Sequence, residues 1–256
     1  MNDLDRFHAF ERRILAGMST RAEPFEYGVA YFDDDVPERY ISNFLLVDAN
    51  APDLSAEVLL ELADRILGGA GLRHRLVVVS GEDDGDRMAP DFRANGYVAE
   101  PSVQMVLRRE PDRPPTLPVE ECSFAESRPL TEEIYRREDG IPIGLIPRFV
   151  DQHESWERRI GARRFIARID GVPAGQCELY VDGPDAQVEF VDTLEEFRGR
   201  GVARAVVLGA ARAAQASGAQ RVFIMGDDDD WPKDLYRRLG FDPMARRWDF
   251  TRAPTG

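Results

Sequence analysis

A short basic segment with two glycines is the part of this sequence best suited to chemistry. Arg198-Gly199-Arg200-Gly201 lies between an apolar stretch at 187–194 and an alanine-rich stretch at 202–216, so we expect a strand, a loop and a helix in that order. The first N–H groups of a helix have no intrahelical partners, and the helix dipole adds positive potential there. Glycines let a ligand approach the backbone, and the arginines add positive charge. The segment therefore predicts an anion site that suits phosphate.

The charge distribution is consistent with such a site but does not establish it. The chain has 33 basic and 47 acidic side chains, a net charge of −14, which argues against general binding to nucleic acid or to an anionic membrane. Residues 197–226 nevertheless contain no acid and five arginines, which are Arg198, Arg200, Arg204, Arg212 and Arg221. A basic helix face that offsets acids elsewhere would have the same composition, so both interpretations stay open.

The elements that must position this segment occur twice along the chain. An apolar strand running into an acidic loop is found at 75–84 and again at 221–230, and a helix end with glycine and an aromatic residue at 92–97 and again at 236–241. The other matching pairs are strands at 41–47 and 187–194, helices at 54–67 and 202–216, and closing strands at 103–107 and 247–251. We therefore predict an α/β fold with two tandem domains, each a mixed, mostly antiparallel sheet with flanking helices.

A proline-rich segment at 113–118 separates the two copies, because it suits neither a helix nor a strand and forms a stiff linker. Residues 1–112 are then the first domain and residues 119–256 the second. The expected elements at the start of the second domain are a strand at 119–124, helices at 130–138 and 147–160, and a hairpin that turns at Asp170-Gly171.

The remaining composition excludes several classes of protein. No apolar run approaches the roughly 18 residues that cross a bilayer, and the acidic N-terminus does not resemble a signal peptide, so we expect a cytoplasmic protein without membrane binding. Every basic residue except Lys233 is arginine, which is typical of a GC-rich bacterial genome. Two cysteines and three scattered histidines provide no metal-ligand spacing. Four consecutive aspartates, Asp227–Asp230, cannot all face one ion, so a loop and helix N-terminus are expected there and no metal.

The basic segment resembles a motif of the GNAT superfamily of N-acetyltransferases. Arg198-Gly199-Arg200-Gly201-Val202-Ala203 is similar to the R/Q-x-x-G-x-G/A pyrophosphate loop of that family, with Ala203 at the last position. Tyr236-Arg237-Arg238-Leu239-Gly240-Phe241 resembles the Y-x-x-x-G-F end of the family's fourth helix. The likeness covers about residues 118–252. The first copy resembles a degenerate version of the same fold, so the whole chain is similar to a tandem GNAT protein.

The resemblance implies acetyl-CoA as co-substrate, no metal, and direct attack of an amine on the thioester. The pantetheine arm would lie where the strands at 187–194 and 221–225 splay apart, and backbone groups of Val191 and Thr193 would polarise the thioester carbonyl. The pyrophosphate would lie on the amides from Gly199 to Ala203. The residues expected to bind the cofactor are Val191, Asp192, Thr193, Arg198, Gly199, Arg200, Gly201, Val202 and Ala203.

Two proton transfers need residues to perform them. Tyr236, at the family's helix-four tyrosine position, is the expected general acid, and Glu189 on the preceding strand the expected base, with Asp192 as the alternative. Structural interpretations compete with both assignments. Tyr236 could be a half-buried aromatic residue with its hydroxyl in water, and Glu189 a carboxylate that faces solvent.

The acceptor and the role of the first copy are less closely defined. The acceptor is expected to be a small-molecule or peptide amine, and the acidic surface favours a cationic one. A longer acyl-CoA donor and a non-catalytic acyl-CoA-binding module stay open, as does the oligomeric state. The first copy has no glycine or arginine at 54–59 and has Phe92 at the tyrosine position. We therefore expect a non-catalytic, structural N-terminal domain and one cofactor per chain.

Overall fold

The structure is a computed structural model that describes residues 1–48, 54–138 and 140–254. Its strands are β1 (Arg21–Phe25), β2 (Gly28–Phe32), β3 (Phe44–Val47), β4 (Arg75–Val79), β5 (Val98–Leu107), β6 (Val119–Cys122), β7 (Arg163–Ile169), β8 (Val172–Asp182), β9 (Asp185–Thr193), β10 (Arg221–Asp227) and β11 (Phe241–Arg252). Its α-helices are α1 (Asp3–Met18), α2 (Ala56–Ala63), α3 (Glu82–Ala94), α4 (Phe124–Arg137), α5 (Ile146–Ile160), α6 (Val202–Ala216) and α7 (Pro232–Arg238). Shorter helical turns are η1 (Tyr40–Ser42), η2 (Asp64–Gly68), η3 (Ile143–Leu145) and η4 (Glu195–Phe197).

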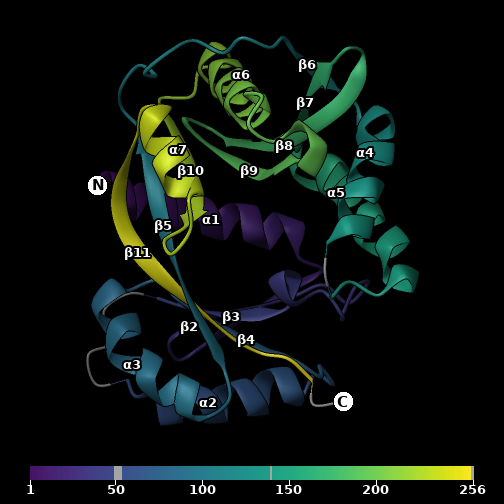
Figure 1. Cartoon of the computed structure of the whole chain (residues 1–256). Helices are drawn as coiled ribbons and strands as arrows, with labels where there is room; N and C mark the ends of the chain where they lie inside the picture. Colours follow the sequence, from purple (N-terminus) through teal and green to yellow (C-terminus); the bar gives the residue numbers. More distant parts are fainter. Residues whose placement is uncertain (49–53, 139, 255–256) are drawn as a thin grey trace. The chain divides into compact units, whose positions relative to one another are not determined.

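The strands form one mixed sheet in the order β1-β2-β3-β4-β11-β5-β10-β9-β8-β7-β6 (Figure 1). The predicted α/β class is confirmed, but the expectation of a separate sheet for each copy is wrong, because the strands of both copies belong to one sheet. β11, which follows the second copy in the sequence, pairs antiparallel with β4 of the first, with Phe250 opposite Val77. β5 of the first copy in turn neighbours β10 of the second. The two closing strands are thus exchanged, which hydrophobic patterning cannot reveal because an exchanged strand buries the same alternating residues.

The chain divides into two compact units that differ from the predicted contiguous ranges of 1–112 and 119–256. What we call the C-terminal unit comprises Met1–Met18, Met105–Met225 and Asp234–Pro243. The N-terminal unit comprises Ser19–Gln104, Gly226–Lys233 and Met244–Gly256. Helix α1 therefore packs with the second copy of the repeat, not with the first. Its Phe10 and Ile14 join a hydrophobic cluster with Trp156 and Tyr180.

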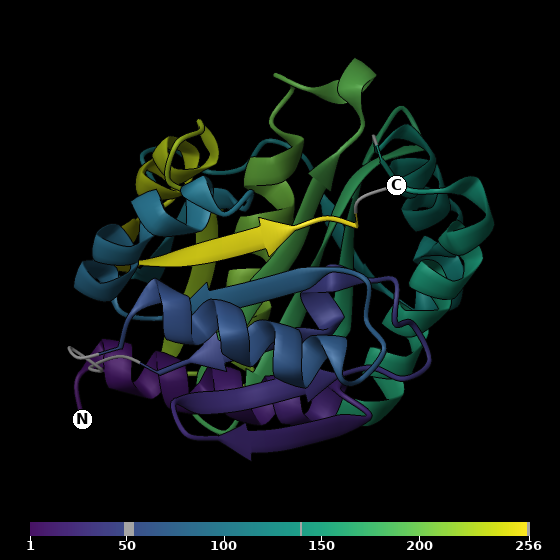
Figure 2. The same ribbon diagram turned by 90° about the horizontal axis from the view of Figure 1, so that it is seen from below.

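In the N-terminal unit, α2 and α3 cover one face of the sheet (Figures 1 and 2). β1, β2 and β3 pair antiparallel, and β3 pairs parallel with β4. Phe92 of α3 is fully buried and stacks on Phe250 with 4.0 Å between ring centroids. The core of this unit is therefore apolar, and the aromatic residue at the tyrosine position of the repeat is part of it.

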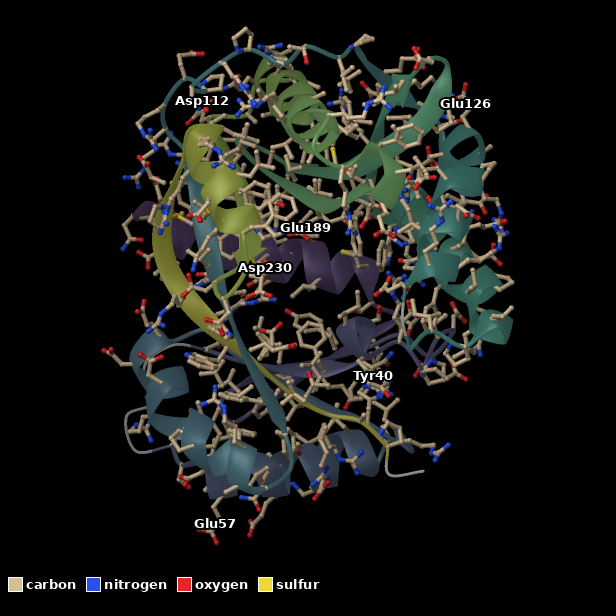
Figure 3. The ribbon with its side chains drawn as sticks, in the orientation of Figure 1. Tyr40, Glu57, Asp112, Glu126, Glu189 and Asp230 are labelled. Carbon is tan, nitrogen blue, oxygen red and sulfur yellow. The ribbon has the colours of Figure 1, made fainter. Side chains whose placement is uncertain are left out.

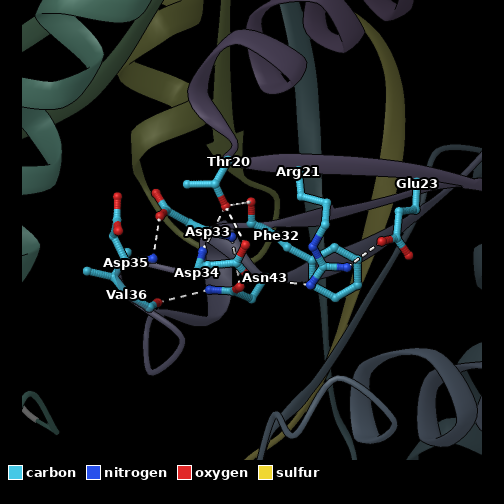
Figure 4. Close-up of polar contacts among 9 residues, drawn as sticks. All are labelled: Thr20, Arg21, Glu23, Phe32, Asp33, Asp34, Asp35, Val36 and Asn43. Atoms are coloured by element: carbon cyan, nitrogen blue, oxygen red, sulfur yellow. Dashed lines mark hydrogen bonds and ion pairs between the residues drawn. The ribbon is translucent and has the colours of Figure 1, made fainter.

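A buried amide shapes the connection between β2 and β3 (Figure 4). The Asn43 Oδ1 atom accepts a hydrogen bond from the Asp33 amide at 2.9 Å, and its Nδ2 atom donates to the carbonyl oxygens of Val36 at 3.0 Å and Arg39 at 2.9 Å. The Asp33 carboxylate in turn accepts from the Asp35 amide at 3.1 Å. The polar side chains of this loop therefore stabilise the conformation of the loop itself.

In the C-terminal unit, β6 to β9 form an antiparallel meander, and β10 then pairs parallel with β9. The predicted turn is confirmed, since Asp170 and Gly171 have φ values of +53° and +81°, as a two-residue hairpin with the right twist requires. The expected strand at 119–124 ends at Cys122 because Ser123 and Glu126 form a capping box that begins α4.

The two faces of β8 contact different helices. The Cys177 thiol donates to the Val206 carbonyl of α6, whereas the Gln176 side chain accepts a hydrogen bond from Thr131 of α4 at 3.1 Å, and Glu178 contacts His153 of α5. We call the side of the sheet that carries Gln176 and Glu178 the α5 face. Within the described residues, no helix is long and apolar enough to cross a membrane.

Candidate functional site

The basic loop ends at an uncapped helix N-terminus. Gly201 is the N-cap residue of α6 with a φ of +87°, and no side chain caps the helix there. Gly199 also has a positive φ, +74°. Among the described residues, no backbone carbonyl accepts a hydrogen bond from the amides of 199–204. Both glycines have a backbone conformation that residues with a side chain rarely adopt. Unpaired N–H groups beside such glycines are the arrangement expected of an anion site.

The arginines of the basic stretch do not all serve this loop. Arg204 is buried, pairs with Asp112 at 2.6 Å and donates to the Arg113 carbonyl at 3.0 Å. Arg221 pairs with Asp3 at 2.8 Å. Arg198 and Arg200 are exposed beside the glycines, and Arg200 lies 3.9 Å from the exposed Asp170 carboxylate. The positive charge available to a ligand is therefore smaller than the composition of 197–226 indicates.

The strand before the loop separates from its parallel neighbour. The pairing of β9 with β10 runs from Asp185 opposite Arg221 to Val188 opposite Ile224. β9 continues beyond this point and stays paired with β8 as far as Thr193, which is opposite Gly175. The register thus leaves the β10-facing edge of 189–193 open, in agreement with the expected splay. The Thr193 hydroxyl oxygen is buried there without a hydrogen-bond partner among the described residues.

A bulge in β9 places both candidate bases on the same face. Glu189 lies opposite Glu178 and Asp192 opposite Gln176, so two residues of β9 stand opposite one residue of β8 between these pairs. Residues three apart in a regular strand point to opposite sides, and the extra residue reverses that alternation. Glu189 and Asp192 therefore both lie on the α5 face.

Tyr236 lies close to both carboxylates. It is 6% exposed, which contradicts the alternative of a half-buried ring with its hydroxyl in water. Burial raises the pKa of Tyr236 well above its ordinary value, and the charges of Glu189 and Asp192 raise it further. Figure 3 shows Glu189 beside α7, the helix that carries Tyr236. The structure therefore brings together three groups that the sequence separates by up to 47 positions, from Glu189 to Tyr236.

The two carboxylates differ in their surroundings. Burial raises the pKa of Asp192 to about 7, and the negative charges of Glu138 and Glu178 add to this effect. Glu189 is half-buried and accepts a hydrogen bond from the side-chain Nε2 atom of Gln187. Asp192 thus exchanges its proton near neutral pH, which is the range in which a general base is most effective.

Sequence reasoning missed a buried polar network behind these carboxylates. Glu178 pairs with Arg164 at 2.6 Å, contacts the Nδ1 atom of His153 and accepts a hydrogen bond from the Tyr180 hydroxyl at 2.6 Å. The Nε2 atom of His153 lies 2.5 Å from the Tyr135 hydroxyl oxygen. Burial alone would raise the pKa of Glu178, but the charges of His153 and Arg164 lower it to about 2. The available signal was the alternation of polar and apolar residues in β8.

The aspartates at the end of β10 are used locally. β10 ends at Asp227 and α7 begins at Pro232, which confirms the expected loop and helix N-terminus. Asp227 accepts from the Asp229 amide at 2.8 Å, Asp230 from the Trp231 amide at 2.7 Å, and Asp228 pairs with Lys233 at 3.1 Å. Across the described parts of the chain, no group of three or more potential ligands is arranged to hold a metal ion.

Comparison with known proteins shows a family resemblance over the region that contains the described site. Residues 128–241 match the model of the acetyltransferase (GNAT) family, a range that includes the basic loop, β9 and Tyr236. This C-terminal region is therefore similar to the GNAT acetyltransferase family. No curated protein matches the chain.

Solved structures show the same fold over nearly the whole chain. A GCN5-related N-acetyltransferase from Kribbella flavida is 19% identical, with a TM-score of 0.67 over 100% of this chain and 97% of that one. A conserved protein of unknown function from Staphylococcus epidermidis is 14% identical, with a TM-score of 0.72 over 91% and 93%. A tandem GNAT protein from the clavulanic acid biosynthesis pathway is 15% identical, with a TM-score of 0.56 over 90% and 80%. At these identities the likeness establishes a GNAT-like fold.

Proposed function

We propose that this protein is an acetyl-CoA-dependent N-acetyltransferase that transfers an acetyl group to a primary amine of a small molecule or peptide by direct attack. One observation carries the proposal. β9 leaves β10 after Val188, and the same chain segment then runs into the uncapped N-terminus of α6. An open strand edge followed by free helix amides suits a ligand with an amide-containing arm and a pyrophosphate.

The residues present fit acetyl-CoA at each part of this path. The amides from Gly199 to Ala203, with the guanidinium groups of Arg198 and Arg200, would hold the pyrophosphate. The open edge at Val191 and Thr193 would pair with the pantetheine amides, and the buried Thr193 hydroxyl offers a polar contact there. The bound co-substrate supplies an acetyl group activated as a thioester.

The carboxylates on the α5 face would prepare the amine. An alkylammonium must lose a proton before it can attack, and Glu189 and Asp192 lie on the face from which it can be taken. The pKa of about 7 at Asp192 favours this residue as the base near neutral pH, while Glu189 is the first choice by its position on the strand. Glu138 and Glu178 add negative charge nearby, which favours a cationic acceptor.

Tyr236 would protonate the leaving thiolate. Its raised pKa keeps the hydroxyl protonated throughout the working pH range, so a proton is always present at this position. The environment of low polarity that raises this pKa also strengthens a hydrogen bond to a developing thiolate.

The N-terminal unit is proposed to be structural. Ser55 caps α2 with its own side chain, which accepts from the Val58 amide at 3.4 Å, and Glu57 adds a negative charge to the first turn. Phe92 has no hydroxyl and is buried against Phe250. Titration of acetyl-CoA into the full-length protein should therefore give one site per chain, and a stoichiometry of two would contradict this assignment.

A single assay tests the proposed activity. Purified protein is incubated with acetyl-CoA and a panel of primary amines that includes polyamines, aminoglycosides and lysine peptides, and release of free thiol is followed. Amine-dependent thiol release supports the transferase, whereas saturable acetyl-CoA binding without turnover would indicate a non-catalytic binding module. Parallel reactions with longer acyl-CoA donors show whether acetyl is the preferred group.

A further inference from the structure

Phe190, at the bulge of β9, has a backbone conformation that its residue type disfavours. Its φ is +49°, in the left-handed region that residues with a Cβ rarely adopt. The strained position separates Glu189 from Asp192, the two carboxylates that the bulge brings to one face. Strained conformations persist only when surrounding contacts hold them, so the contacts of Phe190 show what maintains the bulge.

Two rings of α5 hold the Phe190 side chain. The His153 ring lies 4.8 Å from that of Phe190 with an interplanar angle of 82°, and the Trp156 ring lies 5.5 Å away at 32°. Phe190 also packs against the cluster that includes Phe10 of α1 and Tyr180 of β8. The side chain is therefore enclosed by elements on the α5 face.

His153 is itself fixed at both ring nitrogens. Its Nδ1 atom is bonded to Glu178 and its Nε2 atom lies 2.5 Å from the Tyr135 hydroxyl. Glu178 is anchored by Arg164 at 2.6 Å and by the Tyr180 hydroxyl at 2.6 Å. His153 and Glu178 are 2% and 1% exposed at their side chains. A buried ion pair costs desolvation free energy, and conformational specificity is one established reason for keeping such a group.

We infer that His153 is a positioning residue for the proposed transfer: anchored by Glu178 and Tyr135, it holds Phe190 in its left-handed conformation and thereby keeps Glu189 and Asp192 on the same face of the sheet. The inference rests on the proposed function for its catalytic consequence, but the structural part stands by itself. Without the bulge, regular alternation would turn Asp192 toward α6, away from Glu189. The network of Tyr135, His153 and Glu178 thus determines whether one or two carboxylates lie on this face of the site.

A matched pair of substitutions separates backbone conformation from packing. Phe190→Ala and Phe190→Gly both remove the ring and leave nearly the same cavity, but only glycine adopts a φ of +49° without strain. We expect kcat to fall about tenfold or more below the wild-type value in Phe190→Ala and to stay within about threefold of the wild-type value in Phe190→Gly. The dissociation constant of acetyl-CoA should change less than kcat in both, because the basic loop proposed to hold the pyrophosphate lies beyond the bulge.

A second measurement does not need an acceptor. Hydrogen exchange of the amides at 189–193 in the full-length protein should be faster in Phe190→Ala than in Phe190→Gly. His153→Ala should accelerate the same amides, and its effect should shrink in the Phe190→Gly background, because glycine no longer needs the clamp. Equal losses of kcat and equal exchange in the two Phe190 variants, or an undiminished effect of His153→Ala in the glycine background, would overturn the inference.

The two proposals fail in different ways. If the wild type turns over no amine while the exchange difference appears, the transferase assignment is wrong and the positioning role stands. If the wild type is active and the two Phe190 variants behave alike, the positioning role is wrong and the transferase assignment stands. Should Phe190→Ala fail to fold, the exchange comparison of His153→Ala in the wild-type and Phe190→Gly backgrounds decides alone.

Discussion

The N-termini of α2 and α6 occupy the same place in the repeat, but a side chain caps α2 and no side chain caps α6. α2 begins after Ser55, whose side chain accepts a hydrogen bond from the helix, and Glu57 on its outer surface complements the helix dipole (Figure 3). α6 begins after Gly201, which offers the helix no side-chain partner. A capped helix satisfies its own amides, whereas an uncapped one keeps them for another molecule. An uncapped helix N-terminus is thus a better indication of a ligand site than a capped one.

The strands before these helices differ in the same sense. β3 consists of four buried apolar residues, Phe44–Val47, and pairs with β4 from Leu45 to its end at Val47. β9 carries Glu189 and Asp192 and leaves β10 after Val188. At the end of the repeat, Phe92 stacks on Phe250 in an apolar core, whereas Tyr236 lies beside two carboxylates. One copy has the continuous pairing of a structural sheet, and the other has the interruptions and polar groups of a site.

The strongest test of this comparison removes the open helix end. Gly201→Asp places a side chain at a φ of +87° and a negative charge among the amides, so the dissociation constant of acetyl-CoA should rise at least about 100-fold. Isothermal titration calorimetry measures this change. Gly218→Asp is the matched control, because Gly218 has a φ of +96° at the other end of α6, with no atoms near its missing Cβ. Unchanged binding in a folded Gly201→Asp protein would show that the uncapped end is not the cofactor site.

The next test concerns the carboxylates that only β9 has. If Asp192 is the base, the wild-type rate should rise with pH through about 7, because the carboxylate must be ionised to accept a proton. Asp192→Asn should remove this rise and lower kcat about 100-fold, while Glu189→Gln should retain it. A pH–rate profile in which Glu189→Gln loses the rise and Asp192→Asn keeps it would assign the base to Glu189.

Asp192 also gives a measurement that needs no substrate. Its raised pKa means that the folded protein holds this proton more tightly than the unfolded chain, so stability decreases as pH rises from about 4 toward 7 and stays lower above it. Asn carries no charge and avoids this loss. The Tm of Asp192→Asn relative to the wild type should therefore be higher at pH 8 than at pH 4, by differential scanning fluorimetry. A difference that does not change with pH would mean that Asp192 titrates normally.

Tyr236→Phe makes the second copy resemble the first at the tyrosine position. Because the ring stays and only the hydroxyl is lost, kcat should fall about tenfold or more and the affinity for acetyl-CoA should change little. Steady-state kinetics with a responsive amine gives both values. An unchanged kcat would mean that Tyr236 is a packing residue like Phe92.

The smallest effect is expected at the capped helix. Ser55→Ala removes the cap of α2 and should lower the free energy of unfolding by about 1 kcal/mol, as measured by urea denaturation. Binding of acetyl-CoA and its stoichiometry of one should not change. A weaker cofactor affinity in Ser55→Ala would contradict the division of roles between the two helix ends.

The local features of the site could be predicted from the sequence, and the features that depend on distant contacts could not. The Arg198-Gly199-Arg200-Gly201 loop, the α6 helix and the Asp170-Gly171 turn follow from neighbouring residues. The bulge at Phe190 is different, because alternation alone places Glu189 and Asp192 on opposite faces. The network of His153 and Glu178 joins residues 25 positions apart on different elements, and nothing near either residue indicates the other.

The exchange of closing strands has a consequence for the order in which the protein is made. β4 is complete by residue 79, but β11, which pairs with it, begins only at residue 241. During synthesis, the first half of the chain therefore leaves the ribosome before β11 is made. The β4 edge that pairs with β11 stays unpaired until the last residues emerge. Unpaired edges promote association between nascent chains. Expression of residues 1–112 alone would lack β11 altogether, and a gene truncated near its end would damage the half that was made first.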